Sequence, residues 1–368
     1  MELAENKKLC CGCGACAEIC PMQAITMKPD EEGFLYPVID EDICIECGLC
    51  ESRCHELMPA GNDFVRGEPV FYIAHNNDEE VIMKSASGGA FSALSDVILA
   101  EGGVVYGAVF DEEFNIVHGR AETAEERNRM RSSKYVQSVV SSGIYAQLKE
   151  DLESGRKVLF TGTPCQIAGV QTFLDRDYDN LILCDVICHS VPSPLMWREY
   201  LKMLEDENGG KITYINFRDK TEGWQRASTF KGFRYKIDDG ELKKDDRFYR
   251  LFFGWKTIAR PSCSACKYAQ VNRPSDITIA DYWGVERFAP EWKDFYGVSF
   301  ILTTSPKGEE LLNACRDTMR FEQRDPSEQI SENHRLRGPM GIPEDERAAF
   351  WKDYQEKGFV YALGTMPL

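Results

Sequence analysis

The chain has 368 residues, of which 43% are hydrophobic, 28% are charged and 11% are aromatic. This composition is typical of a folded chain with two or three domains, and it excludes a disordered or fibrous protein. The 60 acidic and 43 basic residues give a net charge of -17, which disfavours nucleic acid and anionic membranes as partners. No uncharged apolar run approaches the roughly 20 residues of a transmembrane helix, so no membrane span is predicted.

The N-terminal residues place two acids before any base, unlike the basic and then apolar leader of a secreted protein. We therefore expect a cytoplasmic protein. In such a chain, the 15 cysteines indicate metal binding or redox chemistry rather than a disulfide framework. Their spacing indicates which of these uses applies.

Cysteines with the same spacing occur twice near the N-terminus, with a period of 34 residues. They are Cys10, Cys13, Cys16 and Cys20, and then Cys44, Cys47, Cys50 and Cys54. Three cysteines at this spacing can direct their thiolates at one iron-sulfur cluster, while the fourth ligates the other cluster. The first predicted ligand set is therefore Cys10, Cys13, Cys16 and Cys54. The second predicted set is Cys44, Cys47, Cys50 and Cys20.

Thiolates also suit zinc, but two copies of a four-cysteine spacing favour 4Fe-4S clusters. Residues 7–56 resemble the bacterial-type two-cluster ferredoxins, which relay single electrons. The second repeat has His55 where the first has Pro21. Because Cys54 is present, we expect His55 to lie at the surface or behind the ligands rather than to ligate. Cys11 falls outside the spacing, and we expect it to be structural.

Prolines and glycines between residues 55 and 69 indicate a linker, which places a domain boundary near residue 60. We therefore expect a ferredoxin-like domain over 1–60 and a larger domain over 61–368. An antiparallel segment near 208–246, rich in charged and aromatic residues, is expected to be inserted in the larger domain, with turns at 208–210 and 239–240.

Extended apolar runs alternate with helical patterns in the larger domain, which predicts an α+β or α/β fold with a partly parallel sheet. The clearest unit is a right-handed crossover. It comprises a strand over 158–162, a helix over 166–174 and a strand over 181–187. Further strands are expected over 70–74, 104–110 and 277–280, with a helix over 90–100. The portion from Lys307 onward is expected to be helical.

Cys165 and Cys188 follow the carboxyl ends of the two crossover strands, which is the edge where parallel sheets bind ligands. Cys263 and Cys266 have a metal-like spacing and would complete a four-thiolate site if their loop folded over that edge. Three buried structural cysteines and a chance pair explain the same residues. The residues alone leave both interpretations open.

Five ordered motifs resemble the family of beta subunits of the coenzyme F-420 hydrogenases and dehydrogenases, over about residues 70–305. They are 85–90 (SASGGA), 133–138 (SKYVQS), 162–169 (GTPCQIAG), 188–193 (CHSVPS), and Cys263-x2-Cys266 followed by 276–284 (DITIADYWG). The family carries FAD beside a 4Fe-4S cluster, so the resemblance implies a flavin-binding domain. It also implies Cys165, Cys188, Cys263 and Cys266 as ligands of a third cluster. Ser190 departs from the glycine common at that position.

The flavin site is expected at glycines that let backbone amides approach a pyrophosphate at a helix N-terminus, although a glycine pair is also a common helix entry. The expected cofactor-binding residues are Ser87, Gly88, Gly89, Ser133, Lys134, Tyr135, Thr163 and Gln166. Lys134 and His189 are the expected catalytic residues, since His189 could move a proton at reduced flavin. The basic cluster from Arg127 to Lys134 could hold phosphate, dock a ferredoxin or form a solvated helix face.

These inferences predict an anaerobic flavin and iron-sulfur oxidoreductase that contains three 4Fe-4S clusters and FAD. It would pass electrons between a ferredoxin, or another redox protein or subunit, and a hydride-accepting small molecule. One alternative is a dehydrogenase of the deazaflavin coenzyme F-420. Another is a non-catalytic electron-transfer subunit of a larger complex. An oligomer is compatible with the sequence.

Overall fold

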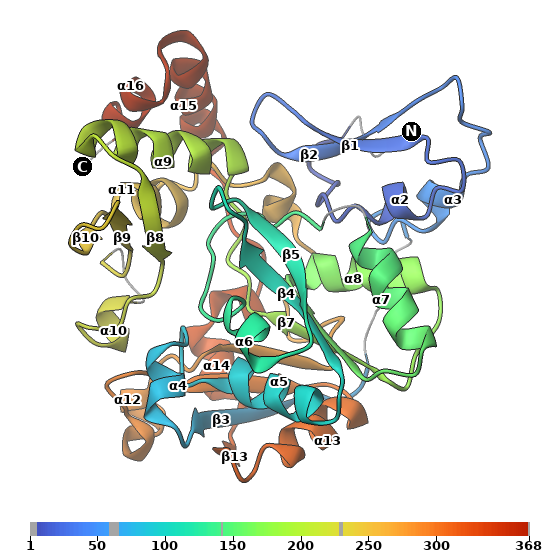
Figure 1. The fold of residues 1–368 in the computed structure, drawn as a ribbon, viewed down its shortest axis with the longest axis vertical. Helices are drawn as coiled ribbons and strands as arrows, with labels where there is room; N and C mark the ends of the chain where they lie inside the picture. Colours follow the sequence, from blue (N-terminus) through green and yellow to red (C-terminus); the bar gives the residue numbers. More distant parts are fainter. Residues whose placement is uncertain (1–5, 59–65, 141–142, 228–230, 367–368) are drawn as a thin grey trace.

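The computed structural model describes residues 6–58, 66–140, 143–227 and 231–366. A small N-terminal lobe rests against a larger mixed α/β body (Figure 1). No helix in these four ranges is both long and apolar enough to cross a membrane.

The N-terminal lobe repeats one local structure twice. Its secondary structure comprises α2 (Ala15–Glu18), β1 (Ile25–Pro29), β2 (Leu35–Ile39) and α3 (Leu49–Ser52). β1 and β2 pair in antiparallel fashion, with Ile25 opposite Ile39. Gly14 and Gly48 precede α2 and α3 with φ values of 83° and 70°, a conformation that glycine adopts without strain. The third cysteine of each repeat is therefore the second residue of its helix.

The larger body is built on an eight-stranded sheet with the order β13-β3-β12-β11-β7-β6-β4-β5. The pairs β4–β6, β6–β7 and β7–β11 are parallel, whereas the outer pairs are antiparallel. The strands are β3 (Val70–Asn76), β4 (Val104–Phe110), β5 (Ile116–Ala121), β6 (Val158–Gly162), β7 (Leu181–Val186), β11 (Ile277–Asp281), β12 (Ser299–Thr303) and β13 (Met319–Gln323). The expected partly parallel sheet is thus confirmed, including the crossover from β6 to β7.

Helices cover both faces of this sheet because alternate side chains of a strand point to opposite faces. Leu159 packs with α5 (Ala90–Ala100) and α13 (Pro306–Ala314) on one face. Its neighbours Val158 and Phe160 pack with α7 (Ile144–Glu153) and α8 (Pro164–Leu174) on the other. The remaining helices beside the sheet are α4 (Glu79–Met83), α6 (Ala124–Asn128), α12 (Val285–Phe288) and α14 (Pro326–Glu332).

A second, aromatic-rich core joins the inserted segment to the C-terminus. The antiparallel sheet of this core has the order β10-β9-β8, from β8 (Ile212–Asn216), β9 (Arg234–Ile237) and β10 (Lys243–Lys244). Trp197, Phe217 and Phe248 pack together at its centre. Its helices are α9 (Pro194–Asn208), α11 (Arg247–Tyr249), α15 (Glu344–Lys357) and α16 (Phe359–Gly364). The short helix α10 (Trp224–Ala227) packs through Trp224 in a separate cluster.

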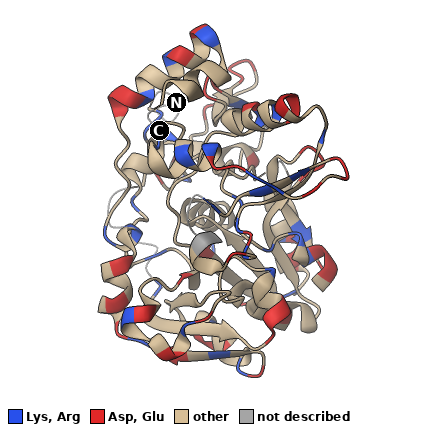
Figure 2. Ribbon diagram, turned by 90° about the vertical axis from the view of Figure 1, so that its left-hand side faces the viewer, with Lys and Arg blue, Asp and Glu red and all other residues tan. Residues whose placement is uncertain are grey.

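Two local expectations are wrong. The portion from Lys307 onward is interrupted by β13, which pairs with β3 at the edge of the sheet. Gly209 ends α9 in a left-handed conformation, with φ 69°, instead of forming a hairpin turn. Charged residues are spread over the periphery of the molecule, while the interior ribbon carries few of them (Figure 2).

Candidate metal centres and cofactor cavity

The first group of cysteines surrounds one small pocket in the N-terminal lobe. Cys10, Cys13, Cys16 and Cys54 all line this pocket. Burial, together with the nearby thiols of Cys10 and Cys54, raises the pKa of Cys16 to about 12. Four thiols this close repel one another when they ionise, so a cationic iron cluster suits them.

The second group comprises Cys20, Cys44, Cys47 and Cys50, and it is more open to solvent. Cys47 is exposed, and the other three are partly exposed. Burial and the nearby Glu51 raise the pKa of Cys50, and the thiol of Cys20 contributes to the same shift. Cys20 of the first repeat therefore lies beside Cys50 of the second repeat, as crossed ligand sets require.

The third group is assembled from three distant parts of the larger body. Gly162 of β6 lies opposite Asp185 of β7, and Cys165 and Cys188 each follow three residues later. Cys263 lies in a 3-10 turn over Pro261–Ala265, and Cys266 follows it directly. All four cysteines line one pocket. Burial raises the pKa of Cys188 well above its usual value, and the three other thiols add to the effect.

Arginines surround the third group. Arg260, Arg273 and Arg335 line the same pocket, and no carboxylate does so among the residues that the structure describes. Arg335 Nη1 is buried without a hydrogen-bond partner. Four thiolates around an iron-sulfur cluster carry net negative charge, and these guanidinium groups would offset it. The donor set and its surroundings therefore fit a 4Fe-4S cluster.

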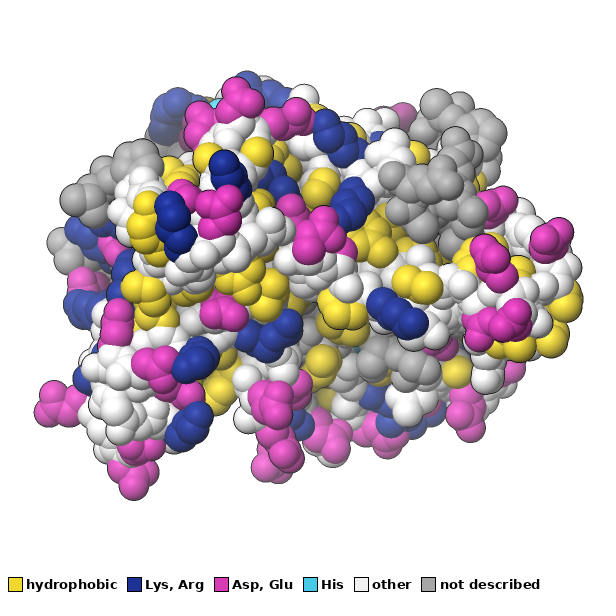
Figure 3. All heavy atoms as spheres, turned by 90° about the horizontal axis from the view of Figure 1, so that it is seen from above, with side chains coloured by type: hydrophobic (Ala, Val, Ile, Leu, Met, Phe, Trp, Pro, Cys, Tyr) yellow, Lys and Arg dark blue, Asp and Glu magenta, His cyan; other side chains and the backbone are white. Residues whose placement is uncertain are grey.

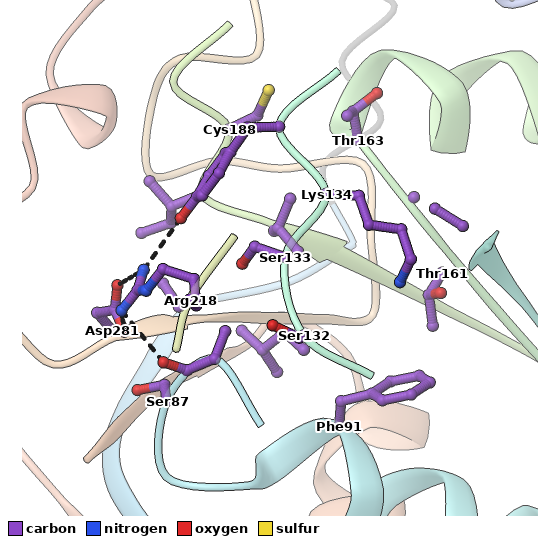
Figure 4. A pocket seen from close by; sticks show the side chains of 18 of the residues that line it. Ser87, Phe91, Ser132, Ser133, Lys134, Thr161, Thr163, Cys188, Arg218 and Asp281 are labelled. Carbon is purple, nitrogen blue, oxygen red and sulfur yellow. Dashed lines mark hydrogen bonds and ion pairs between the residues drawn. The ribbon is translucent and has the colours of Figure 1, made fainter. Parts of the chain in front are cut away.

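A cavity of about 310 Å³ lies next to the third group (Figure 4). Its wall includes residues at the carboxyl ends of β6, β7 and β11, the edge at which parallel sheets bind ligands. The segment 188–191 lines both this cavity and the pocket of the third group. A cluster bound by Cys188 and a molecule bound in the cavity would therefore lie next to each other.

Most of the cofactor-binding and catalytic residues expected from the sequence line this cavity. Those that line it are Ser87, Gly89, Ser133, Lys134, Tyr135, Thr163, Gln166 and His189. Gly88 is not among the lining residues. A Cβ at Gly88 would lie 2.6 Å from the backbone nitrogen of Ser299. Gly88 therefore permits close packing of its loop on the sheet.

Lys134 lines the cavity, and its ammonium group points toward Thr161 (Figure 4). Its Nζ donates to the carbonyl of Arg131 at 3.1 Å, and no ion pair to a described carboxylate is formed. Burial lowers the pKa of Lys134 to about 7. Burial also lowers the pKa of His189 to about 4, with Arg335 adding to the shift, so His189 is neutral at pH 7.

Thr163 and Gln166 already use their side chains to start α8. Gln166 Oε1 accepts hydrogen bonds from Thr163 N at 2.9 Å and from Thr163 Oγ1 at 3.1 Å, forming a capping box. Gln166 Nε2 donates to the carbonyl and the hydroxyl of Ser138. These two residues shape the cavity wall, and α8 directs its N-terminus there.

The inserted segment supplies a buried ion pair that the sequence did not suggest. Arg218 donates to Asp281 with distances of 2.9 and 3.1 Å, and to Tyr135 Oη at 3.0 Å (Figure 4). Trp224 Nε1 donates to the same carboxylate. Although burial opposes ionisation of Asp281, Arg218 holds its pKa below the usual value. Asp281 therefore anchors the cavity wall.

Several buried polar atoms of the cavity wall lack a hydrogen-bond partner within the described part of the chain. They belong to His118, Arg131, Ser132, Ser190 and Arg218. Each such atom costs free energy unless a ligand or water satisfies it. The aromatic side chains of Phe91, Phe253 and Trp283 also line the cavity. Polar and aromatic groups together fit a flavin with its phosphates.

Arg127 does not belong to a solvated or docking surface. Arg127 is 1% exposed, and its side chain pairs with Asp96 at 2.6 Å and donates to the carbonyl of Ser92. Arg127 therefore fixes α6 on α5. In the rest of the basic run, Arg131 and Lys134 line the cavity wall, whereas Arg129 is exposed.

Two family models match separate parts of the chain. Residues 9–56 match the 4Fe-4S dicluster domain. Residues 155–329 match the C terminus of the coenzyme F420 hydrogenase/dehydrogenase beta subunit. The chain joins an iron-sulfur ferredoxin domain to a coenzyme F420 hydrogenase/dehydrogenase beta-subunit domain. It is therefore an iron-sulfur protein of the electron-transfer type.

Curated relatives of this combination are subunits or enzymes of redox metabolism. The chain is 23% identical to a subunit of the F(420)H(2) dehydrogenase of Methanosarcina mazei, over 48% of this chain and 51% of the relative. It is 26% identical to the coenzyme F420-dependent sulfite reductase of Methanocaldococcus jannaschii, over 83% of this chain and 46% of the relative. The chain thus spans about half the length of these relatives.

A solved structure was also similar, the F420-reducing [NiFe] hydrogenase complex of Methanosarcina barkeri. The match has a TM-score of 0.49 and 17% identity, and it covers 76% of this chain and 98% of the matched chain.

Proposed function

We propose that this beta-subunit relative is a flavin and iron-sulfur oxidoreductase. It passes electrons between a redox protein and a hydride-accepting small molecule, through three 4Fe-4S clusters and FAD. The segment 188–191 carries the proposal, because it forms a common wall between the third group and the cavity. A cluster supplies one electron at a time, whereas a flavin accepts single electrons and can transfer a hydride.

The groups form a graded series from solvent to the cavity. The second group is the most exposed, with Cys47 at the surface. The first group lies deeper, with Cys10 only 8% exposed. The third group lies at the sheet edge beside the cavity. This order favours entry of electrons at the second group and delivery at the cavity.

The residues of the cavity would hold FAD by charge and by shape. Arg131 and Lys134 offer positive charge on the wall, which suits the pyrophosphate. The first turn of α5 contributes backbone amides, since Gly89 provides no side-chain cap. His189 lies between the cavity and the third group, where it could hold a proton near the reacting ring.

The lobe that carries the second group is acidic and apolar at its surface (Figure 3). Ile43 is 44% exposed and Ile45 is 60% exposed, on either side of Cys44. Asp42 and Glu46 flank them and are exposed as well. Apolar contact ringed by basic residues would complement this surface. We therefore favour a redox partner with a basic docking face over an acidic ferredoxin.

A second candidate function is oxidation or reduction of coenzyme F420. Two relatives carry this coenzyme in their names, and the basic cavity wall suits an anionic coenzyme. Anaerobic mixing of the flavin-loaded protein with reduced coenzyme F420 distinguishes the two. Bleaching of the flavin supports this candidate, whereas an unchanged flavin spectrum supports another hydride acceptor.

The proposal is tested by metal and flavin analysis of protein purified without oxygen. We expect about twelve iron atoms and one FAD per chain, since each group of four cysteines holds one cluster. About eight iron atoms would remove the third cluster from the account. Full iron content without flavin would instead support a non-catalytic electron-transfer subunit.

A further inference from the structure

Cys11 lies between the first and third groups of cysteines, although it belongs to neither. It is 9% exposed. Its sulfur lies within 4.8 Å of the Cys13 sulfur, and it lines the pocket of the third group together with Cys165. Of the described residues, only Cys11 lines both the pocket of the first group and the pocket of the third group. This one side chain therefore spans the space between the two groups.

His55 and Tyr268 make a parallel connection. His55 directly follows Cys54 of the first group, and Tyr268 lies two residues after Cys266 of the third group. A hydrogen bond of 2.7 Å joins Tyr268 Oη to His55 Nδ1, which also lies 3.3 Å from Glu56 Oε1. His55 Nε2 lies 3.5 Å from the Cys11 sulfur. The histidine thus links Tyr268 to Cys11.

Side chains of the larger body hold the loop that carries Cys11. Arg260 Nε donates to the carbonyl of Cys10 at 2.9 Å, and Gln137 Nε2 donates to the carbonyl of Cys11 at 2.9 Å. Tyr145 Oη donates to the carbonyl of Cys13 at 2.8 Å. Three donors from the larger body fix this short loop. The position of Cys11 is therefore set by the contact between the lobe and the larger body.

We propose that Cys11, held by His55 and Tyr268, is a positioning residue that connects the first and third clusters and adjusts their reduction potentials. The inference rests on the proposed function, because it requires both clusters. Transfer along this connection removes one electron from one cluster and adds it to the other, and no bond forms or breaks. The electron comes from the redox partner named above.

The physical basis is a hydrogen bond that the Cys11 thiol would donate to a neighbouring cluster ligand such as Cys13, whose sulfur lies within 4.8 Å. Reduction adds negative charge to the ligand sulfurs, and a donor to those sulfurs favours the reduced form. Removing a hydrogen bond to a charged group costs enough free energy to change an equilibrium by about tenfold. For a one-electron step, tenfold corresponds to about 59 mV.

The test is a redox titration followed by EPR on the iron-loaded full chain. In Cys11→Ala, the reduction equilibrium of at least one of the two clusters should shift about tenfold toward the oxidised form. The reduction potential of that cluster is then lower than in the parent protein. Cys11→Ser keeps a donor and should lie closer to the parent protein. Tyr268→Phe should give a smaller shift in the same direction. Cys315→Ala removes a buried thiol elsewhere, on α13's side of the sheet, and should change neither potential.

Two results separate the possible failures. A Cys11→Ala protein with full iron and unchanged potentials would overturn the role of Cys11 while leaving the proposed function intact. Equal shifts in Cys11→Ala and Cys11→Ser would also overturn it, because the donor would then be irrelevant. Only about eight iron atoms in the parent protein would sink the proposed function itself.

Discussion

The cysteine groups of the N-terminal lobe and the group of the larger body reach similar donor sets by different routes. In the lobe, a repeated spacing and two short helices place three cysteines of each set together. In the larger body, β6, β7 and the turn over Pro261–Ala265 each contribute to the third group. The lobe's sites are encoded locally, whereas the third site exists only when the sheet has formed.

The largest expected effect on the third group comes from substitution of Cys266. In Cys266→Ser, we expect loss of about four iron atoms per chain, because the third group loses a thiolate while the other groups keep theirs. Cys47→Ser should lose the same amount from the exposed second group. Iron analysis together with EPR of the remaining clusters distinguishes these cases. Equal iron in Cys266→Ser and the parent would refute the third ligand set.

The dependence of the third site on the sheet is tested at Asp281. Asp281→Asn leaves Arg218 buried without its partner, which should destabilise the larger body by about 3–5 kcal/mol. Because Arg218 lowers the pKa of Asp281, the stabilisation is present above the usual carboxyl pKa and disappears as pH falls through the lowered one. Thermal unfolding measures both effects.

The surface pair Lys202 and Asp206, one helical turn apart on α9, provides the control. Asp206→Asn should change the free energy of unfolding by less than about 1 kcal/mol. Similar decreases in the free energy of unfolding for Asp206→Asn and Asp281→Asn would contradict a larger contribution from the buried Arg218 pair.

Substitution of Gly169 tests the contact between the N-terminal lobe and the larger body. A Cβ there would lie 2.9 Å from Cys13 Cβ and 3.1 Å from Cys13 Sγ. Gly169→Val should therefore displace the first group and cost about 1–3 kcal/mol. Gly341 faces open space, so Gly341→Ala should be neutral in the same denaturation assay. A native first-cluster EPR signal in Gly169→Val would count against the contact.

Lys134 gives the smallest expected effect, and it concerns the cavity alone. Its pKa of about 7 means that Lys134 loses its charge as pH rises above neutrality, whereas a bound pyrophosphate would raise that pKa. The affinity for FAD should therefore be highest below pH 7 and should fall by about tenfold as the pH rises above 7. Lys134→Arg should abolish the dependence. A flat profile in the parent protein, measured by flavin fluorescence, would exclude Lys134 from the phosphate site.

The sequence was sufficient for elements whose signal is local. The strands over 158–162 and 181–186 and the helix over 90–100 follow from apolar runs and periodicity. The short strand Met319–Gln323 was missed because only its pairing with β3 stabilises it. Arg218 was missed because it lies more than 60 residues from Asp281, and no spacing rule links residues that meet only through the fold.

The same distinction holds within the sites. The grouping of Cys10, Cys13, Cys16 and Cys54 around one pocket follows from spacing, while their crossed ligation stays a prediction. The positions of Cys165 and Cys188 follow from their places after two strands. The position of Cys11 could not, since one extra cysteine beside a repeat carries no signal of its own. Its contact with His55 lies within the lobe, whereas its place beside Cys165 arises where the lobe packs on α8.

The central claim is that a third iron-sulfur cluster lies at the sheet edge beside the cavity. An anomalous difference map at the iron absorption edge, from crystals grown without oxygen, locates the iron directly. We expect three separate peaks, one of them enclosed by Cys165, Cys188, Cys263 and Cys266. Two peaks in the N-terminal lobe, with no iron at the sheet edge, would contradict the account.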